Sequence, residues 1–394
     1  MIKHPTLLRG RGAHQHNKVS FIELFFDLVF VFAITQLSHA LIADFSPQGA
    51  LRALMLMLAV WWVWIFTTWV TNWLDPDRSP VRVAMMALSL AGLVLAASIP
   101  QAFAERAPVF ACTYVAMQVG RSLFFLWAVR GHPGMVRNFQ RILAWLMAGA
   151  VCWLAGAWTD EQTRPIWWAA ALVIEYLSPS LGFHVPGLGR SATTDWDVDG
   201  AHLSERCGLF IIIALGESVL VTGATFAGMD WTPEAITAMV ASFVGSLAMW
   251  WLYFDATADI ASHQIEHAND PGRLARLGYT YLHLFFVAGI IVSAVADEFV
   301  LHHPMGHTAP ATAVAVIGGT LAYLMGGLLF RRVVMGHWSG ACVLGMAVLV
   351  ALGLTAEHWP PLALATGSSV VLVAIAVWEA RNRARCLPTS ATGH

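Results

Sequence analysis

The sequence predicts an all-helical membrane protein, a polytopic transmembrane bundle of about twelve spans. Three observations support this fold class. Hydrophobic residues make up 58% of the chain and charged residues only 12%, whereas a soluble domain carries about 25% charged residues. Hydrophobic runs recur along the chain, each about as long as a helix that crosses the ~30 Å apolar layer of a bilayer. The Lys and Arg residues between these runs alternate in density.

The hydrophobic runs define the expected spans in chain order. The longest polar interruption, residues 185–204, separates six runs from six others. The spans are expected at about residues 21–43, 50–73, 82–103, 108–129, 139–158, 165–184, 205–227, 235–258, 276–299, 309–330, 338–355 and 361–380.

The basic residues predict the direction of each span. Eighteen of the 22 Lys and Arg residues lie in the N-terminal tail, in every second loop and in the C-terminal tail. Only Arg52, Arg106 and Arg164 lie in the opposite loops. Because cytoplasmic loops carry an excess of Lys and Arg, this asymmetry predicts that both termini are cytoplasmic and that odd-numbered spans run outward. The net charge of −2 shows no basic excess, so the expected partner is the lipid bilayer and not nucleic acid.

A weak similarity between the two groups of six spans predicts an internal repeat. Trp61-Trp62-Val63-Trp64 in span two matches Trp250-Trp251-Leu252-Tyr253 in span eight. Because six is even, two such halves would have the same orientation in the membrane. The alternative is that any two Trp-rich membrane helices look alike. The expected organisation is a cytoplasmic tail (1–20), a first six-helix half (21–184), a cytoplasmic linker (185–204), a second half (205–380) and a cytoplasmic C-terminal tail (381–394).

Ionisable residues inside the spans are the candidate functional residues, because charge at bilayer depth is costly. Glu23 and Asp27 stand four residues apart in span one and therefore share a helical face. In span seven His202, Arg206 and Glu217 fall within about 60° of one another, which predicts one polar stripe. We expect spans one and seven to bring Asp27 within reach of this stripe.

Three more ionisable residues lie inside expected spans: Arg121 in span four, Glu175 in span six and His283 in span nine. A lone guanidinium in lipid is unfavourable, so Arg121 is expected to pair with Asp27, Glu175 or Glu217. The alternative is that such a pair is only structural and that the remaining acids are protonated or interfacial. The outer half of the membrane offers few polar residues, namely His39, Thr71, Asn72, Asp297 and Glu298.

Two further patterns have structural interpretations. The Trp clusters at residues 61–73, 153–168 and 250–251 are assigned to the aromatic belts at the lipid headgroups. The segment Asp195–Gly200 has the acids that open a calcium loop, but Arg206 stands at position twelve, where a Glu is needed. We therefore interpret this segment as a solvated acidic linker.

Two strings resemble the hallmark segments of the bacterial low temperature requirement A family. The first is Phe21-Ile22-Glu23-Leu24-Phe25-Phe26-Asp27-Leu28-Val29-Phe30-Val31-Phe32-Ala33, and the second runs from His202-Leu203-Ser204-Glu205-Arg206 to Leu215-Gly216-Glu217-Ser218. The resemblance covers essentially the whole chain. It implies a multi-pass protein of the cytoplasmic (inner) membrane, and it brings no settled biochemical activity.

Three classes of function fit these residues. The first is a transporter or channel for a small solute or cation, in which Asp27 and Glu217 are the membrane-embedded carboxylates, Arg121 is their counter-charge, and Glu23, Glu205 and Arg206 shape the cytoplasmic mouth. The second is an intramembrane enzyme, metal-dependent or not, that acts on a lipid or hydrophobic substrate with Glu23, Asp27, His202 and Glu205. The third is a structural or sensory protein. The sequence identifies no cofactor or metal, and it leaves the oligomeric state open.

Overall fold

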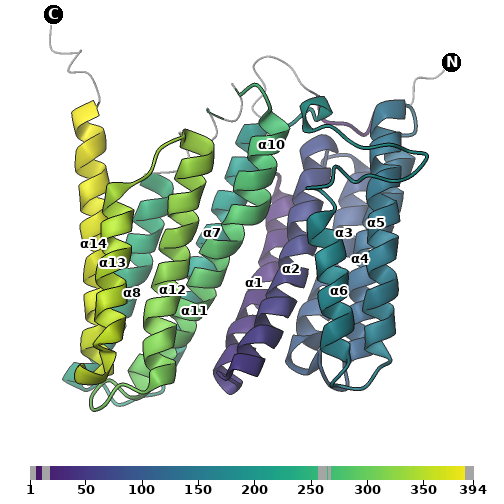
Figure 1. Ribbon diagram of the computed structural model, residues 1–394. Coiled ribbons are helices and arrows are strands. Elements are labelled where there is room, and N and C mark those ends of the chain that lie inside the picture. Colours follow the sequence, from purple (N-terminus) through teal and green to yellow (C-terminus); the bar gives the residue numbers. More distant parts are fainter. Residues whose placement is uncertain (1–5, 11–17, 256–263, 265–267, 387–394) are drawn as a thin grey trace, which may run out of the picture. The chain divides into compact units, whose positions relative to one another are not determined.

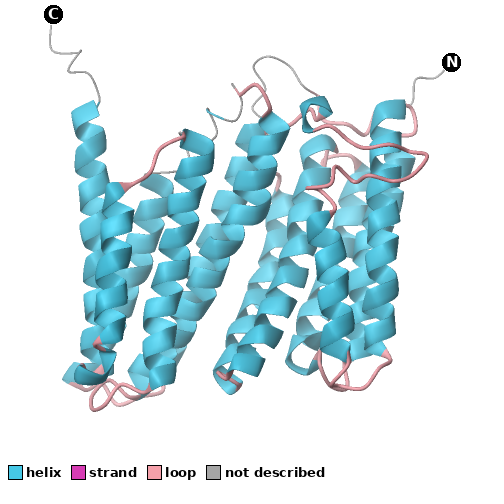
Figure 2. Ribbon diagram, in the orientation of Figure 1, coloured by secondary structure: helices cyan, strands magenta, loops and turns pink. Residues whose placement is uncertain are grey.

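The computed structural model describes residues 6–10, 18–255, 264 and 268–386, and these residues form an all-helical protein (Figures 1 and 2). Helix makes up 80% of it, in twelve helices and without strands in the described part, so the predicted fold class is confirmed. Isolated bridges join Leu8 to Leu74 and Val185 to Gly189.

The helices follow the hydrophobic runs. Within the described residues, ten are long and apolar enough to cross a membrane. The helices are α1 (Phe21–Ala43), α2 (Pro47–Trp73), α3 (Ser79–Ser98), α4 (Ala107–Ala128), α5 (Pro133–Ala157), α6 (Arg164–Leu177), α7 (Gly200–Ala227), α8 (Pro233–Tyr253), α10 (Pro271–Ala275), α11 (His283–His302), α12 (Pro310–Phe330), α13 (Gly340–Leu354) and α14 (Pro361–Cys386). A π-helical turn, η4 (Arg276–Leu282), joins α10 and α11 into one continuous helix, so the thirteen labels stand for twelve helices.

Two helices are shorter than a membrane span. α6 has 14 residues and α13 has 15, which gives each a length of about 21–23 Å. α6 ends at Leu177, well before the expected residue 184. The reason is that Pro179 lacks an amide hydrogen and the chain then turns through Gly182 and Phe183, which both have positive φ.

The chain divides into two compact units. Unit 1 comprises residues 1–206 and 266–275, and unit 2 comprises residues 207–265 and 276–394. Helix α7 begins in unit 1 with residues 200–206 and continues in unit 2.

Unit 1 is built around α2. Every residue of α2 from Ala59 to Trp73 is buried, and α1, α4 and α6 pack against this helix. The indoles of Trp61, Trp62, Trp64, Trp153 and Trp168 are at most 2% exposed. Their assignment to aromatic belts is therefore wrong. They fill the core of unit 1, where for example Trp62 stacks on Tyr176 with ring centroids 4.1 Å apart.

Unit 2 contains a close approach between α11 and α12. A Cβ atom added at Gly289 would lie 2.6 Å from the backbone nitrogen of Tyr323, and one added at Gly319 would lie 2.7 Å from Ser293 Oγ. Only glycine therefore lets these helices pack so closely, as small residues do in membrane bundles. The packing places Ser293 and Thr320 beside one polar cavity.

Candidate functional site

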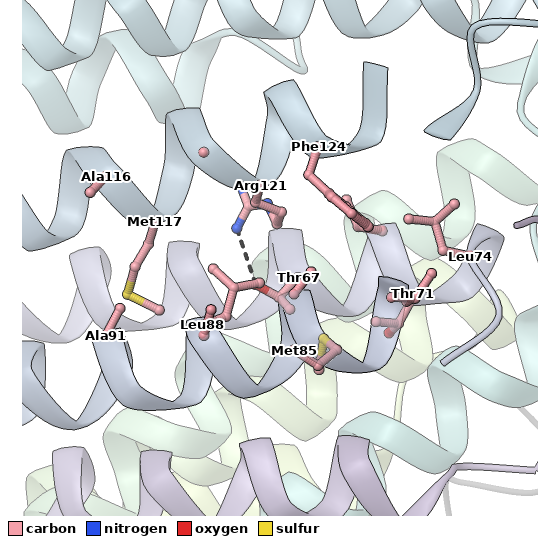
Figure 3. Close-up of a pocket in the computed structure, with 15 residues that line it drawn as sticks. Thr67, Thr71, Leu74, Met85, Leu88, Ala91, Ala116, Met117, Arg121 and Phe124 are labelled. Atoms are coloured by element: carbon pink, nitrogen blue, oxygen red, sulfur yellow. Dashed lines mark hydrogen bonds between the residues drawn. The ribbon is translucent and has the colours of Figure 1, made fainter. Parts of the chain in front are cut away.

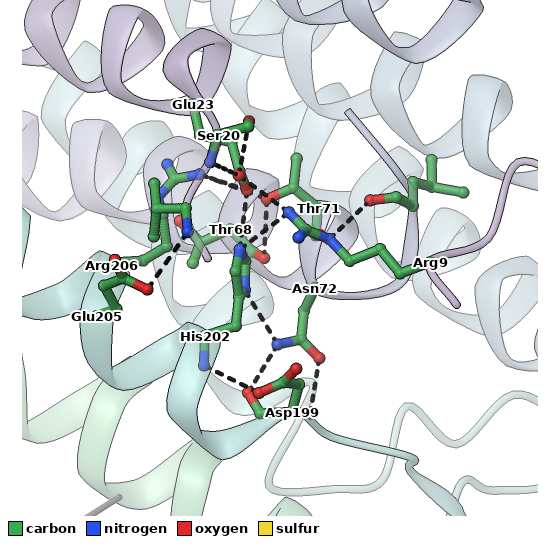
Figure 4. A network of polar contacts seen from close by, with 12 residues as sticks. Arg9, Ser20, Glu23, Thr68, Thr71, Asn72, Asp199, His202, Glu205 and Arg206 are labelled. Carbon is green, nitrogen blue, oxygen red and sulfur yellow. Dashed lines mark hydrogen bonds and ion pairs between the residues drawn. The ribbon is translucent and has the colours of Figure 1, made fainter. Parts of the chain in front are cut away.

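A buried cluster of charged side chains lies at the end of unit 1 where α1 and α7 begin and α2 ends (Figure 4). We call it the arginine–carboxylate cluster, and it consists of Arg9, Glu23, Asp27, His202 and Arg206. The side chains of Glu23, His202 and Arg206 are 0% exposed and that of Arg9 is 7% exposed. Charges buried this deeply are stable only when they are paired and hydrogen-bonded.

The first turns of α1 and α7 position the carboxylate of Glu23 and the side chain of His202. Glu23 lies in the first turn of α1, where its Oε2 accepts hydrogen bonds from the backbone and the hydroxyl of Ser20, both at 2.9 Å. Asp199 caps α7, because its carboxylate accepts from the backbone N–H of His202 at 2.9 Å. The interpretation of this segment as a solvated linker is therefore wrong for Asp199.

Glu23 is held by two arginine side chains and one histidine side chain. Oε2 accepts from Arg9 Nη2 at 2.9 Å, and Oε1 accepts from Arg206 Nη1 at 3.0 Å. Oε1 also lies 3.0 Å from Nε2 of His202. Charge-assisted bonds of this kind are roughly twice as strong as neutral ones.

Arg9 Nη2 lies 3.1 Å from Nε2 of His202, but the contacts of the ring with Asn72 and Glu23 assign one tautomer. Asn72 Oδ1 accepts from the backbone of Asp199 at 3.1 Å, so the amide nitrogen of Asn72 is the atom that faces His202 Nδ1, at 3.2 Å. Nδ1 is therefore an acceptor, and Nε2 carries the hydrogen that is donated to Glu23. In this arrangement His202 is neutral and joins α2, α7 and α1.

Arg206 also holds Asp27. Its Nη2 donates to Asp27 Oδ1 at 2.5 Å, and the same oxygen accepts from Trp64 Nε1 at 2.7 Å. The guanidinium lies over the Trp64 ring at 5.7 Å from the centroid. The expectation that Asp27 meets the polar stripe of span seven is confirmed.

The N-terminal segment completes the cluster. Arg9 Nε donates to the carbonyl of Thr71 at 2.7 Å, and the backbone N–H of Arg9 donates to the carbonyl of Trp73 at 2.9 Å. Thr71 and Asn72 therefore lie at the same end of unit 1 as Glu23, and their placement in the outer half was wrong. Since α2 runs opposite to α1, its last turn returns to the end where α1 begins. Glu205 is exposed and accepts from the backbone of Val19 at 3.3 Å.

A second polar chain crosses unit 1 from α6 to α4. The carboxylate of Glu175 accepts from Tyr114 Oη and from Trp153 Nε1, the latter at 3.0 Å. Tyr114 Oη in turn accepts from Gln118 Nε2 at 3.1 Å, and Gln118 Oε1 accepts from Arg121. The expectation that Arg121 forms a direct ion pair is wrong for the described residues, because Tyr114 and Gln118 lie between its guanidinium and the carboxylate of Glu175.

Unit 2 holds a cavity of about 40 Å³ whose wall contains six Ser and Thr residues, one carboxylate and six apolar residues. Its one carboxylate is Asp297, whose Oδ2 accepts from Ser218 Oγ at 2.9 Å. Ser218 Oγ also lies 3.0 Å from Ser246 Oγ. Asp297 forms no ion pair with any residue that the structure describes. Other hydroxyl-bearing residues in the wall are Ser242, Ser293, Thr320, Ser368 and Ser369.

The remaining candidates lie elsewhere in unit 2. Glu217 directly precedes Ser218 and is 1% exposed. His283 is fully buried, with Nδ1 2.9 Å from the carbonyl of Gly278 and Nε2 2.8 Å from Tyr253 Oη. Because a carbonyl only accepts, Nδ1 carries the hydrogen, and His283 links the π-helical turn to α8.

Nowhere in the described chain do three or more His, Cys, Asp or Glu side chains come together as a candidate metal site. The two acids of span one contact arginines, histidine and tryptophan, and Asp297 contacts hydroxyls. The arrangement can therefore do two things chemically: lock helices through ion pairs in unit 1, and surround a small cation with oxygen atoms in unit 2.

The fold and these buried charged groups define a multi-pass helical membrane protein. Residues 18–377 match the family model described as bacterial low temperature requirement A protein (LtrA), and the chain belongs to this family. It is 39% identical over 378 residues to the uncharacterized protein RA0937 of Rhizobium meliloti (strain 1021), which covers 95% of this chain and 92% of that protein. No solved structure matches the chain.

Proposed function

We propose that this protein is a transporter or channel that moves a small monovalent cation, alone or together with a solute. The observation that carries the proposal is the position of Asp297 in a hydroxyl-lined cavity without a basic partner in the described residues. A carboxylate inside a membrane segment is costly unless a proton or a cation accompanies it.

The ligands suit a small hard cation. Carboxylate and hydroxyl oxygens are the donors that such cations prefer. One carboxylate among neutral hydroxyls balances a single positive charge. The cavity of about 40 Å³ exceeds the ~10–15 Å³ that one water molecule requires, so it has room for one ion that has lost most of its water.

The arginine–carboxylate cluster supports a different role for the acids of α1. Glu23 and Asp27 already contact Arg9 and Arg206, so a cation there would compete with two guanidinium groups. We therefore propose that Asp27 holds α1 and α7 together, and that Asp297, in place of Asp27, is the carboxylate that binds the cation. Glu217 stays in the proposed pathway, because it lies on the membrane-embedded helix that carries Ser218.

Flux measurements in proteoliposomes test this proposal. The wild-type protein should take up radioactive sodium or rubidium, or respond to an imposed pH gradient. Asp297→Asn should lower the flux to that of liposomes without protein. Glu298→Gln is the matched control, because Glu298 is the next residue of α11, lies outside the cavity wall and, among the described residues, forms an ion pair with His302 alone. Equal flux in Asp297→Asn and wild type, or no flux of these three cations in the wild type, would contradict the proposal.

A further inference from the structure

A second cavity, of about 240 Å³, lies within unit 1 between α2, α3 and α4 (Figure 3). Its wall is mostly apolar, and the only charged side chain in it is Arg121. The wall also contains Ala87, Ala116 and Gly120, which are exposed on the surface of the unit. These small residues place the mouth of the cavity on the side of α3 and α4, within the length of two membrane-spanning helices.

Arg121 retains hydrogen-bond donors that the protein does not use. Its Nη1 donates to the carbonyl of Val63 and to Thr67 Oγ1, both at 3.1 Å, and its Nη2 donates to Gln118. A guanidinium has five N–H groups, so one hydrogen on Nη2 and the hydrogen on Nε remain. Nε is buried and has no hydrogen-bond partner in the described structure.

Among the residues that the structure describes, the charge of Arg121 also lacks a direct counter-charge. The side chain is 3% exposed, and the acceptors that it contacts are an amide, a hydroxyl and a carbonyl, all neutral. Glu175 is reached only through Gln118 and Tyr114. A buried guanidinium in such surroundings attracts an anion, and the hydrogen that remains on Nη2 can be donated to a carboxylate oxygen.

We propose that this cavity binds a fatty acid from the bilayer, with the carboxylate on Arg121 and the hydrocarbon chain along the apolar wall. The positive charge of Arg121 favours an acid over a neutral lipid. The apolar wall and the opening on the side of α3 and α4 favour a ligand that is dissolved in the membrane. Thr67 keeps Arg121 in place, because it accepts from Nη1 while its own hydroxyl donates to Val63 at 2.8 Å.

The test uses the full-length protein in nanodiscs of phosphatidylcholine and measures binding of radiolabelled oleate. Wild type should bind about one oleate per chain saturably, and unlabelled oleate should compete. Oleyl alcohol, which has the same chain without the charge, should compete at least about tenfold more weakly, because it lacks the carboxylate that would accept a charge-assisted hydrogen bond from Arg121. Equal competition by oleyl alcohol would contradict the role of Arg121. Competition by phosphatidylglycerol as strong as that by oleate would identify a phospholipid headgroup as the ligand and overturn the proposal.

Two variants locate the site. Gly120→Leu should fill the mouth and lower oleate affinity at least about tenfold without loss of thermal stability, because a Cβ there would meet no atom within 4 Å. Ala148→Leu, on the exposed face of α5 outside the cavity, is the control and should bind like wild type. Arg121→Gln should also weaken binding, and its melting temperature shows whether it folds. Unchanged binding in folded Gly120→Leu would place oleate elsewhere and overturn the proposal.

Discussion

Arg206 and Asp27 form a fully buried ion pair, with Nη2 and Oδ1 2.5 Å apart. The two residues are 179 positions apart in the chain, and the pair fastens the start of α7 to α1. Arg206 also contacts Glu23, which Arg9 holds from the other side. The Arg206 guanidinium thus bridges two acids that stand a single helical turn apart and would otherwise repel each other, and Arg9 supplies the second positive charge.

Removal of Arg206 should destabilise the protein strongly. Arg206→Met leaves Asp27 with Trp64 as its remaining hydrogen-bond donor, and a buried pair broken from one side costs about 3–5 kcal/mol. The free energy of unfolding in detergent measures this loss. The double variant Arg206→Met with Asp27→Leu should recover part of it, because no charge is then left alone at this position. Additive losses would show that the two side chains are not coupled.

Trp64→Phe should have a smaller effect. The substitution removes the indole N–H that donates to Asp27 and keeps most of the aromatic ring. A lost hydrogen bond to a buried charge costs about 1–3 kcal/mol. Thermal unfolding should show the decrease, whereas Trp167→Phe, at a position that is 40% exposed, should stay within about 0.5 kcal/mol of wild type. Similar melting temperatures for both variants would argue against the hydrogen bond.

Two glycine substitutions should change stability in opposite directions. A Cβ at Gly149 would lie 2.8 Å from Glu175 Oε1, so Gly149→Ala should displace that carboxylate and cost about 1–3 kcal/mol. Gly120 also lies in a helix but has open space around it. Gly120→Ala should therefore raise stability by about 0.5–1 kcal/mol through lower backbone entropy in the unfolded chain. A stable Gly149→Ala would mean that Glu175 does not pack against α5.

The predicted topology can be tested by labelling. In a variant without native cysteines, a cysteine introduced at His303 should react with an impermeant maleimide from outside intact cells, and one at Asp197 should not. The reason is the concentration of Lys and Arg in the loops that belong to the same side as residue 197. The reverse labelling pattern would invert the topology.

The helices could mostly be predicted from the sequence because hydrophobic length determines most of them, whereas Pro179 and the turn at Gly182 and Phe183 end α6 early. The contact between Asp27 and Arg206 could be predicted in part, because spans one and seven are the most polar spans and each carries one of the two residues near its start. Trp64 and Arg9 were missed, because the rotation of α2 and the path of the N-terminal segment depend on tertiary packing. For Thr71 and Asn72 a signal did exist. An even-numbered span returns to the side where span one begins, so the end of span two belongs with Glu23.

The environment of Arg121 also carried a signal. Tyr114, Gln118 and Arg121 follow the spacing i, i+4 and i+7 and therefore share one helical face. A chain of hydrogen bonds along α4 could thus have been predicted from the sequence. By contrast, the cavity of Asp297 takes its wall from α8, α11, α12 and α14. No pattern within a single helix brings hydroxyls from four helices together, and the sequence alone indicated only that Asp297 is a polar residue in the outer half.

The most direct test of the central claim is equilibrium binding of a monovalent cation to the purified protein. Radioactive sodium and rubidium are titrated onto wild type, Asp297→Asn and Glu298→Gln in detergent at constant ionic strength. We expect saturable binding of about one sodium or rubidium ion per chain in wild type and Glu298→Gln, and its loss in folded Asp297→Asn. Undiminished binding in Asp297→Asn, or no saturable binding of either ion to wild type, would contradict the assignment of Asp297 as the cation-binding carboxylate.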